Sequence, residues 1–287
     1  MRYVFELQVG PVGFRIGSDW AGPIDALRGL YAGYPRPRGA CDFTVRLEAT
    51  RPWRRWLRPS VAIRGDYILP DAAPLPLSLG LLAAEMGMNL QMALGQKRFL
   101  LLHAASVERE GRALVITGLS GAGKSTLSAL LGEAGWRFMG DEFALLDLES
   151  GDLHPFPRAV SLKNEALALF PQVEPGRLGP LLSGTPKGRI RHLRPNSEAL
   201  PRMAEPARPA LILFPRFGRD FASETRPVGG AEVFVRLTQA STNYVALGEA
   251  GFAALQRLVA TVPARAIDYS SSEEAIALVE TLWDGLE

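Results

Sequence analysis

The alternation of apolar and polar residues predicts that the chain begins with β-structure. Alternating runs of this kind cover residues 3–9, 12–16, 43–47 and 62–69. Gly10-Pro11 separates the first two runs, an arrangement that is typical of a β-hairpin. A segment rich in proline and alanine then follows, and the pattern changes. We therefore expect a β-rich N-terminal region over residues 1–72 and a second domain over 73–287.

The first part of the second domain is predicted to be a long apolar helix. The apolar stretch runs from about Ser78 to Leu94 and is followed by Gly95, a residue that tolerates the backbone conformation at which helices often end. The stretch contains Glu85, Asn89 and Gln91, and burying these in lipid would cost several kcal/mol in sum. The pattern therefore indicates a core helix, and we expect no membrane partner.

Beyond this helix, short apolar runs alternate with helical segments, which predicts an α/β fold. The expected strands are 112–117, 136–139, 143–148 and 211–214, and the expected helices include 127–133 and a segment around 252–259. Ser271 followed by Glu274 has the spacing of a capping box and predicts the start of a last helix.

Composition narrows the functional classes. The chain has 287 residues, with 32 Lys and Arg against 30 Asp and Glu, which gives a formal charge of +2. A charge this small provides no general attraction to nucleic acid. Cys41 is the single cysteine, which excludes an intrachain disulfide and a cysteine-based metal cluster. The acidic Glu6 interrupts any signal-peptide core, and we expect a cytoplasmic protein.

The most informative motif is a complete phosphate-binding loop of the Walker A type. The sequence from Gly118 to Thr126 fits G-x-x-x-x-G-K-S and follows directly on the predicted strand 112–117. Glycines allow backbone N–H groups to turn toward an anion, and the helix that follows adds a favourable dipole. The candidate nucleotide-binding residues are Gly118, Ser120, Gly121, Ala122, Gly123, Lys124, Ser125 and Thr126. Thr126 also fits a supporting role in the helix.

Two residues of this loop have distinct expected tasks. Lys124 supplies a positive charge for the β- and γ-phosphates, and the Ser125 hydroxyl can bind Mg²⁺. The next predicted strand delivers adjacent carboxylates, Asp141 and Glu142, at its end. Neighbouring side chains at a strand tip point in different directions. We therefore interpret Asp141 as a base toward an acceptor hydroxyl and also as a candidate metal ligand, and Glu142 as metal support. A solvated strand end is the alternative.

Three features together resemble the HPr kinase/phosphorylase family, whose kinase domain is similar to phosphoenolpyruvate carboxykinases. They are Leu102-His103-Ala104 before the loop, the loop itself, and the Asp141-Glu142 pair after one short helix. The resemblance implies a P-loop kinase core with ATP and Mg²⁺. It also implies that Asp141 acts on a serine hydroxyl, with Lys124 and Ser125 at the phosphates. His103 would then contact phosphate or acceptor, although a histidine at such a place also fits a core position.

Other segments resemble a divergent branch, often called HPr-kinase-related kinase A. They are 160–165, 184–195 and Thr242-Asn243-Tyr244, while the Glu-x-Arg-Gly-x-Gly stretch of the HPr enzymes is not found. The resemblance implies that the acceptor is a serine of a peptide or protein. It also suggests that the protein forms a homo-oligomer, because the HPr enzymes form oligomers.

Two basic segments complete the candidate sites. Lys187, Arg189, Arg191 and Arg194 lie within eight positions between glycine-rich and proline-rich flanks. A loop of this kind could contact phosphates or an acidic acceptor, or it could be solvated without a role. In residues 51–59, arginines alternate with Trp53 and Trp56, which suits base stacking or an acidic partner. A solvated connector is again the alternative.

The sequence leaves three functions open. An ATP-dependent kinase acting on a peptide or protein serine is the leading hypothesis. A small-metabolite kinase or ATPase is the second, because the loop alone does not identify the acceptor. A nucleotide-responsive binding module without catalysis is the third.

Overall fold

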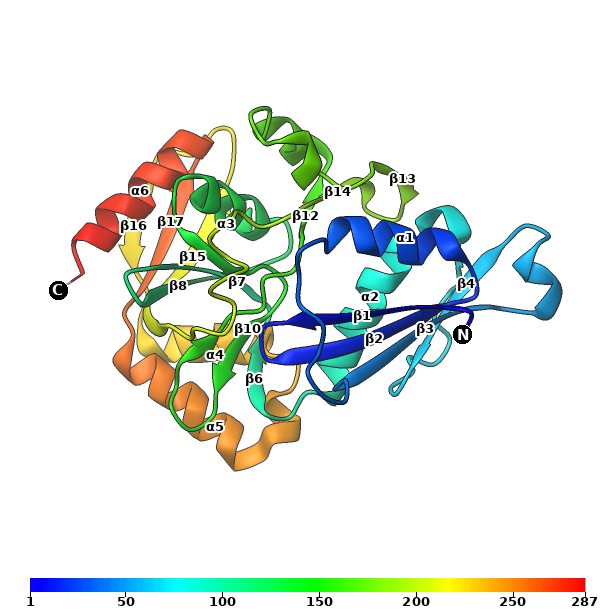
Figure 1. The fold of residues 1–287 in the computed structure, drawn as a ribbon. Helices are drawn as coiled ribbons and strands as arrows, with labels where there is room; N and C mark the ends of the chain where they lie inside the picture. The colour runs from blue at the N-terminus through cyan, green and yellow to red at the C-terminus, as the bar shows by residue number, and fades with distance from the viewer. Residues whose placement is uncertain (287) are drawn as a thin grey trace. The chain divides into compact units, whose positions relative to one another are not determined.

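The structure is a computed structural model that describes residues 1–286, and it divides into two compact units (Figure 1). Unit 1 consists of Met1–Gln96 and Ala159–Arg194, and unit 2 consists of Lys97–Arg158 and the chain from Pro195 onward. This division differs from the boundary expected at 72/73. The apolar helix that was assigned to the second domain packs on the N-terminal sheet, and a later segment returns to unit 1.

Unit 1 is built on a five-stranded sheet with the strand order β1-β2-β3-β4-β5. Its strands are β1 (Tyr3–Val9), β2 (Val12–Ser18), β3 (Phe43–Ala49), β4 (Ser60–Gly65) and β5 (Leu75–Pro76). The predicted hairpin is confirmed, because β1 and β2 pair in antiparallel register from Tyr3↔Ser18 to Val9↔Val12. β2 and β3 are parallel, and the chain between them forms α1 (Ala21–Leu30). The sequence pattern did not predict α1.

The predicted apolar helix is confirmed as α2 (Gly80–Gly95), which packs against β3 and β4. Gly87 lies so close to β3 that a Cβ atom there would be 2.5 Å from a methyl group of Val45. Gly95 ends the helix but does not adopt the left-handed conformation that was expected there. Glycine is needed for lack of space, because a Cβ atom would lie 2.3 Å from the Tyr67 ring and 2.6 Å from the Phe43 ring. The stretch Leu77–Gly95 is long and apolar enough to cross a membrane, but 61% of it is buried within the protein. This is consistent with a core helix of a protein that is not membrane-bound.

The returning segment of unit 1 forms a small sheet with the order β12-β14-β13. Its strands are β12 (Val160–Lys163), β13 (Leu182–Thr185) and β14 (Gly188–Leu193). The basic segment that was expected to be a loop is therefore mostly strand. β13 and β14 form a hairpin in which Thr185 Oγ1 donates to the carbonyl of Gly188 at 2.7 Å.

Unit 2 contains a six-stranded sheet with the order β16-β17-β15-β8-β7-β9 and a three-stranded sheet with the order β11-β10-β6. The larger sheet consists of β7 (Ala104–Arg109), β8 (Arg112–Thr117), β9 (Arg137–Gly140), β15 (Arg208–Phe217), β16 (Glu224–Pro227) and β17 (Ala264–Tyr269). The smaller sheet consists of β6 (Phe99–Leu102), β10 (Ala144–Asp147) and β11 (Leu153–His154). The helices are α3 (Lys124–Glu133), α4 (Gly230–Ala240), α5 (Tyr244–Thr261) and α6 (Ser272–Asp284). The expected mixed α/β organisation is confirmed, and Ser271 Oγ accepts the N–H of Glu274 as the capping box predicts.

Helices and the smaller sheet cover the larger sheet on both faces (Figure 1). The main core lies between β8, β15, β17, the smaller sheet, α4 and α5. Helices α3 and α6 pack together on the opposite face. Burial on both faces explains why strands such as β8 are apolar throughout rather than alternating.

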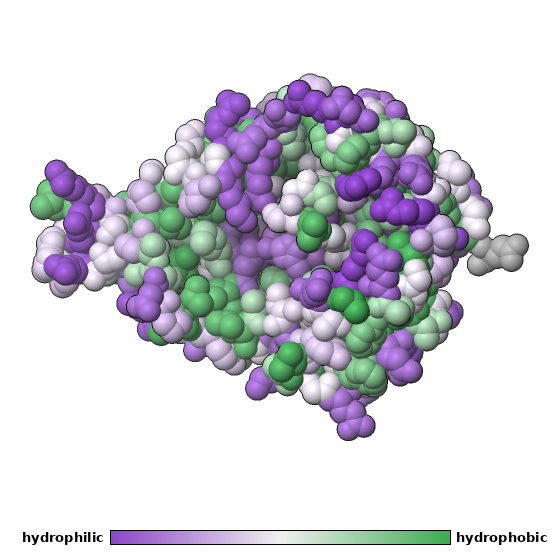
Figure 2. All heavy atoms as spheres, turned by 180° about the vertical axis from the view of Figure 1, so that it is seen from behind, coloured by the Kyte–Doolittle hydropathy of each residue, from purple (hydrophilic) through white to green (hydrophobic). Residues whose placement is uncertain are grey.

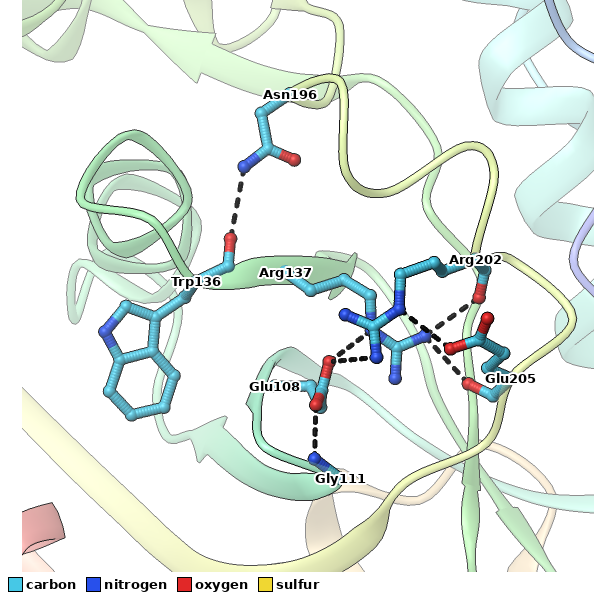
Figure 3. A network of polar contacts seen from close by, with 7 residues as sticks. All are labelled: Glu108, Gly111, Trp136, Arg137, Asn196, Arg202 and Glu205. Carbon is cyan, nitrogen blue, oxygen red and sulfur yellow. Dashed lines mark hydrogen bonds and ion pairs between the residues drawn. The ribbon is translucent and has the colours of Figure 1, made fainter.

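A buried ionic network fixes the strand that leads to Asp141 (Figure 3). The Arg137 side chain on β9 is 2% exposed and forms an ion pair with Glu108 on β7, which is 1% exposed. Arg137 Nη1 also donates to the carbonyls of Arg202 and Glu205, each at 2.8 Å. Burial raises the pKa of the Glu108 carboxyl. The N–H of Gly111, Arg137 and the nearby Arg202 outweigh this effect and hold the pKa below its usual value.

Candidate functional site

The loop from Gly118 to Gly123 connects the end of β8 to the start of α3, in the order that the motif predicts. Gly118, Gly121 and Gly123 have φ values of 148°, 86° and 93°, which L-residues with a Cβ rarely adopt. The chain can therefore turn back on itself directly at a helix N-terminus. Residues 118–121 are exposed, so their backbone groups are accessible to a ligand.

Lys124 holds this loop in its curved shape. It is the first residue of α3, is 7% exposed, and its Nζ donates to the carbonyls of Gly118 at 2.8 Å and Leu119 at 3.1 Å. The ammonium group is thus positioned under the loop by the loop's own backbone. A bound anion over the same backbone would face this positive charge and the N-terminal end of the α3 dipole.

Tyr269, at the end of β17, packs against the loop from a distant part of the sequence. A Cβ atom on Gly123 would lie 2.4 Å from the Tyr269 hydroxyl. Glycine is required there both by this close approach and by the positive φ. Burial raises the pKa of the Tyr269 hydroxyl to about 12, so it remains a neutral hydrogen-bond donor near the loop at physiological pH.

The sheet brings Asp141 to the same edge as the loop. β7 pairs antiparallel with both β8 and β9, so β8 and β9 run in the same direction and end at the same edge. They are two strand spacings apart, which is about 10 Å. Asp141 directly follows β9 and is 8% exposed. Gly140 makes the tight bend before it, since a Cβ there would be 3.0 Å from the carbonyl oxygen of Phe143 and 3.1 Å from that of Phe156.

His103 and Glu142 lie together at this edge. His103 connects β6 to β7, and its carbonyl accepts a hydrogen bond from Thr117 Oγ1, at the end of β8, at 3.3 Å. His103 Nδ1 is 3.8 Å from Glu142 Oε1, and both side chains are partly exposed. Asn243 fixes the strand before His103 by accepting the N–H of Leu101 at 2.9 Å and donating to the carbonyl of Phe99 at 2.8 Å.

A cavity of about 650 Å³ opens beside the loop. Its walls include the loop from Gly118 to Ala122, the end of β15, and three arginines. The polar residues of the wall are Thr117, Ser120, Arg216, Arg226, Arg236 and Gln239. The cavity is large enough for a nucleotide-sized ligand, whose sites typically measure about 300–1,000 Å³.

Two of these arginines share one carboxylate. Arg216 forms a two-point ion pair with Asp268, and Arg226 Nη1 lies 3.4 Å from the same carboxylate. The hydrogen bonds from Arg216 hold the pKa of Asp268 below its usual value and outweigh the opposing effect of burial. Glu224 also attracts Arg216, and Glu232 forms an ion pair with Arg236. Each arginine of the wall therefore has an acidic neighbour, with which a bound anion would compete.

Sequence reasoning missed the cavity arginines, although a signal was present. Pro215-Arg216 follows directly on the predicted core strand 211–214, and β15 runs parallel to β8. Because ligands of α/β sheets bind at the carboxyl ends of parallel strands, polar residues that end such a strand are natural candidates. Arg226, Arg236 and Tyr269 carried no comparable local signal.

The basic segment from Lys187 to Arg194 does not belong to unit 2. Lys187, Arg189, Arg191 and Arg194 lie in unit 1, whereas the loop and Asp141 lie in unit 2. Lys187 and Arg189 are exposed, while Arg191 Nε donates to the carbonyl of Gly179 at 2.8 Å. Arg194 donates to the carbonyl of Ala32. Contacts of these four residues with phosphate or acceptor stay a prediction.

Similarity to known proteins was found among solved structures. No family model and no curated protein matches the chain. Among solved structures, the Hpr(Ser) kinase/phosphatase from Coxiella burnetii is similar to 64% of this chain and 93% of its own. The identity is 14% and the TM-score is 0.29. A likeness this slight assigns neither a family nor a function.

Proposed function

We propose that the protein is an ATP-dependent kinase that transfers the γ-phosphate to a hydroxyl group, with a serine of a peptide or protein as the acceptor. The observation that carries the proposal is one sheet edge. There, β8 and β9 lie on either side of β7. The glycine loop, with Lys124 beneath it, follows β8, and the buried carboxylate of Asp141 follows β9. A phosphate grip and a base about two strand spacings apart suit transfer of a phosphoryl group between two bound partners.

The residues of this edge have distinct roles in the proposal. The backbone of Gly118–Gly123 and the Lys124 ammonium bind the phosphate tail and stabilise its charge. Asp141 accepts the proton of the acceptor hydroxyl, and His103, close to Glu142, contacts phosphate or acceptor.

The donor set at this edge also fits Mg²⁺. Ser125, Asp141 and Glu142 offer oxygen ligands, and Mg²⁺ in phosphoryl transfer is typically held by one or two carboxylates together with substrate phosphates and waters. Among residues 1–286, no group of three or more His, Cys, Asp or Glu side chains could hold a metal ion by itself. The ion would therefore arrive with the nucleotide and offset negative charge on its phosphates.

The acceptor class is the least constrained part of the proposal. A peptide or protein serine is supported by the sequence resemblance, in which Asp141 takes the place of the family's base. The site itself supports transfer to a hydroxyl, because a carboxylate within hydrogen-bond reach can accept its proton.

The test uses two substitutions that separate binding from transfer. Lys124→Ala is expected to lose ATP binding, because the charge beneath the loop is gone. Asp141→Asn is expected to bind ATP normally and to lose transfer. ATP binding is measured by calorimetry, and transfer is measured with γ-labelled ATP and candidate serine peptides, with label located by mass spectrometry.

Matched controls are available on the same unit. Lys97 is exposed, and Asp152 lies in the turn between β10 and β11, so Lys97→Ala and Asp152→Asn should leave both readouts unchanged. If label reaches only free metabolites, the protein is a small-metabolite kinase, and if it is released only as inorganic phosphate, the protein is an ATPase. Either result would rule out a peptide acceptor. Tight ATP binding without transfer to any acceptor would overturn the catalytic proposal in favour of a binding module.

A further inference from the structure

The segment between β3 and β4 in unit 1, residues 51–59, displays two tryptophans on a small rigid support, and we call it the Trp-Arg loop. We propose that the Trp-Arg loop binds an acidic segment of a polypeptide. The proposal concerns binding alone and does not depend on phosphoryl transfer.

The backbone of the Trp-Arg loop is ordered by its own hydrogen bonds. Pro52–Arg55 forms one 3₁₀ turn, and the N–H groups of Trp56 and Leu57 both donate to the carbonyl of Trp53, at 3.2 and 3.0 Å. Trp53 lies within this turn, and Trp56 directly follows it. Both tryptophans are therefore held on a segment with an ordered backbone.

Unit 1 anchors the base of the Trp-Arg loop. The indole N–H of Trp20 donates to the carbonyl of Arg55 at 2.9 Å, and Arg55 forms an ion pair with Asp19. A binding surface that is already ordered loses less conformational entropy when a partner arrives. The anchoring therefore favours a recognition element over a solvated connector.

The apolar side chains of the Trp-Arg loop are open to solvent. Trp53, Trp56 and Leu57 are 52%, 76% and 67% exposed, whereas Trp136 and Trp283 are buried. Figure 2 shows strongly hydrophobic and strongly hydrophilic side chains side by side on the segment that projects at the left of the view. Exposed tryptophan beside arginine is the composition that most often dominates the energetics of protein interfaces.

The charge of the Trp-Arg loop is strongly positive and local. It has four arginines and no acidic residue, and without them the chain has 28 basic against 30 acidic residues. Asp19 balances Arg55. Arg51, Arg54 and Arg58 form no ion pair with any residue in 1–286. Three unbalanced guanidinium groups around two indoles complement carboxylates that alternate with apolar side chains.

The same geometry disfavours a lipid surface and a nucleic acid. Arg51 lies over the Trp53 ring at 5.3 Å and Arg55 over the Trp56 ring at 5.9 Å. Inserting these indoles into hydrocarbon would carry the guanidinium groups along, at about 2.5–3.5 kcal/mol each, or break the contacts. Affinity for a nucleic acid grows with the number of phosphates that a protein neutralises, and three arginines without an acidic partner would neutralise only a few.

The test measures binding of a fluorescein-labelled twelve-residue peptide of alternating Glu and Leu to the full chain without nucleotide. We expect saturable binding that weakens with salt, and no binding of the matched Lys-Leu peptide. The double substitutions W53A/W56A and R54E/R58E should each weaken binding at least tenfold. Leu69 and Arg38 are exposed residues of unit 1 outside the Trp-Arg loop, so L69A and R38E should bind as wild type does.

The proposal is overturned if both loop variants bind the peptide as tightly as wild type does, or if the two control variants weaken binding as much as the loop variants do. It is also overturned if phosphatidylglycerol vesicles or a twelve-nucleotide single strand bind more tightly than the peptide. Circular dichroism and thermal melting verify that each variant is folded, which is expected because the substituted side chains are mainly exposed. Lys124 lies in unit 2, outside the Trp-Arg loop, so Lys124→Ala should bind the peptide as wild type does even though it is expected to lose ATP binding. Peptide binding and the kinase proposal can therefore fail independently of each other.

Discussion

Arg137 offers the sharpest test of how the strand before Asp141 is held in place. The Glu108 carboxylate is 1% exposed in the native protein, so in Arg137→Met it would be buried without its main partner. It keeps the N–H of Gly111 and a contact with Arg202 at 3.4 Å. The carbonyls of Arg202 and Glu205 lose their charged donor. Breaking one partner of a buried ion pair typically costs about 3–5 kcal/mol, and we expect a loss of stability in this range.

Arg109 provides the matched control because it is the next residue on β7. It pairs with Glu280 at two points, but the two side chains are 30% and 31% exposed. A partly exposed ion pair is screened by water and typically contributes about 1 kcal/mol or less to stability. The Arg109 guanidinium also stacks on the Trp136 ring, which adds about 0.5–1 kcal/mol. Arg109→Met should therefore cost about 0.5–2 kcal/mol.

The assay is urea-induced unfolding followed by circular dichroism and tryptophan fluorescence, with the double substitution Glu108→Leu/Arg137→Met completing a cycle. The double variant should lose less stability than the sum of the two single variants, because neither charge is then left buried alone. The reasoning is refuted if Arg137→Met costs no more than Arg109→Met, or if the two single effects add.

Further predictions concern pH and the loop. The pKa of Glu108 is lower in the folded protein than its unfolded value of 4.5. Its contribution to stability is therefore complete above pH 4.5 and is lost as the pH falls through the lower folded value. The difference in unfolding free energy between wild type and Glu108→Gln, measured by urea unfolding, should shrink below about pH 4.5. Gly123→Ala should weaken ATP binding in calorimetry more than tenfold, because a left-handed alanine costs about 1–2 kcal/mol and meets the Tyr269 hydroxyl. Adding Tyr269→Phe should restore part of the affinity, and unchanged affinity in Gly123→Ala would contradict the geometry. Arg216→Met removes one guanidinium group from the cavity wall and should weaken ATP binding about tenfold or more, since a hydrogen bond to a charged group contributes about 1.5–3 kcal/mol; equal affinity would remove Arg216 from the site.

The local parts of the fold were predictable because they are encoded in short segments. Strand 112–117, the loop that follows and Asp141 at a strand end all lie within about thirty residues, where periodicity and turn residues act directly. The placement of His103 beside Glu142 follows from neighbouring strands of the same region.

The remaining features depend on pairing between distant segments. Tyr269 reaches Gly123 only because β17 lies beside β15, and β15 beside β8. The return of 159–194 to unit 1 likewise has no local signal. Helix α1 was missed because Pro23 and two glycines, Gly22 and Gly29, weaken its helical pattern, while burial of Ile24, Leu27 and Leu30 stabilises it in the folded unit.

The central claim is that the loop from Gly118 to Gly123 holds a triphosphate at the sheet edge where Asp141 directly follows β9. A crystal structure of the protein with Mg²⁺ and a non-hydrolysable ATP analogue tests it most directly. We expect the β- and γ-phosphates in the curve of the loop, the Lys124 ammonium against them, and the Asp141 carboxylate facing the side from which an acceptor hydroxyl would approach. A complex in which the nucleotide binds elsewhere, or in which Asp141 points away from the terminal phosphate, would contradict the account.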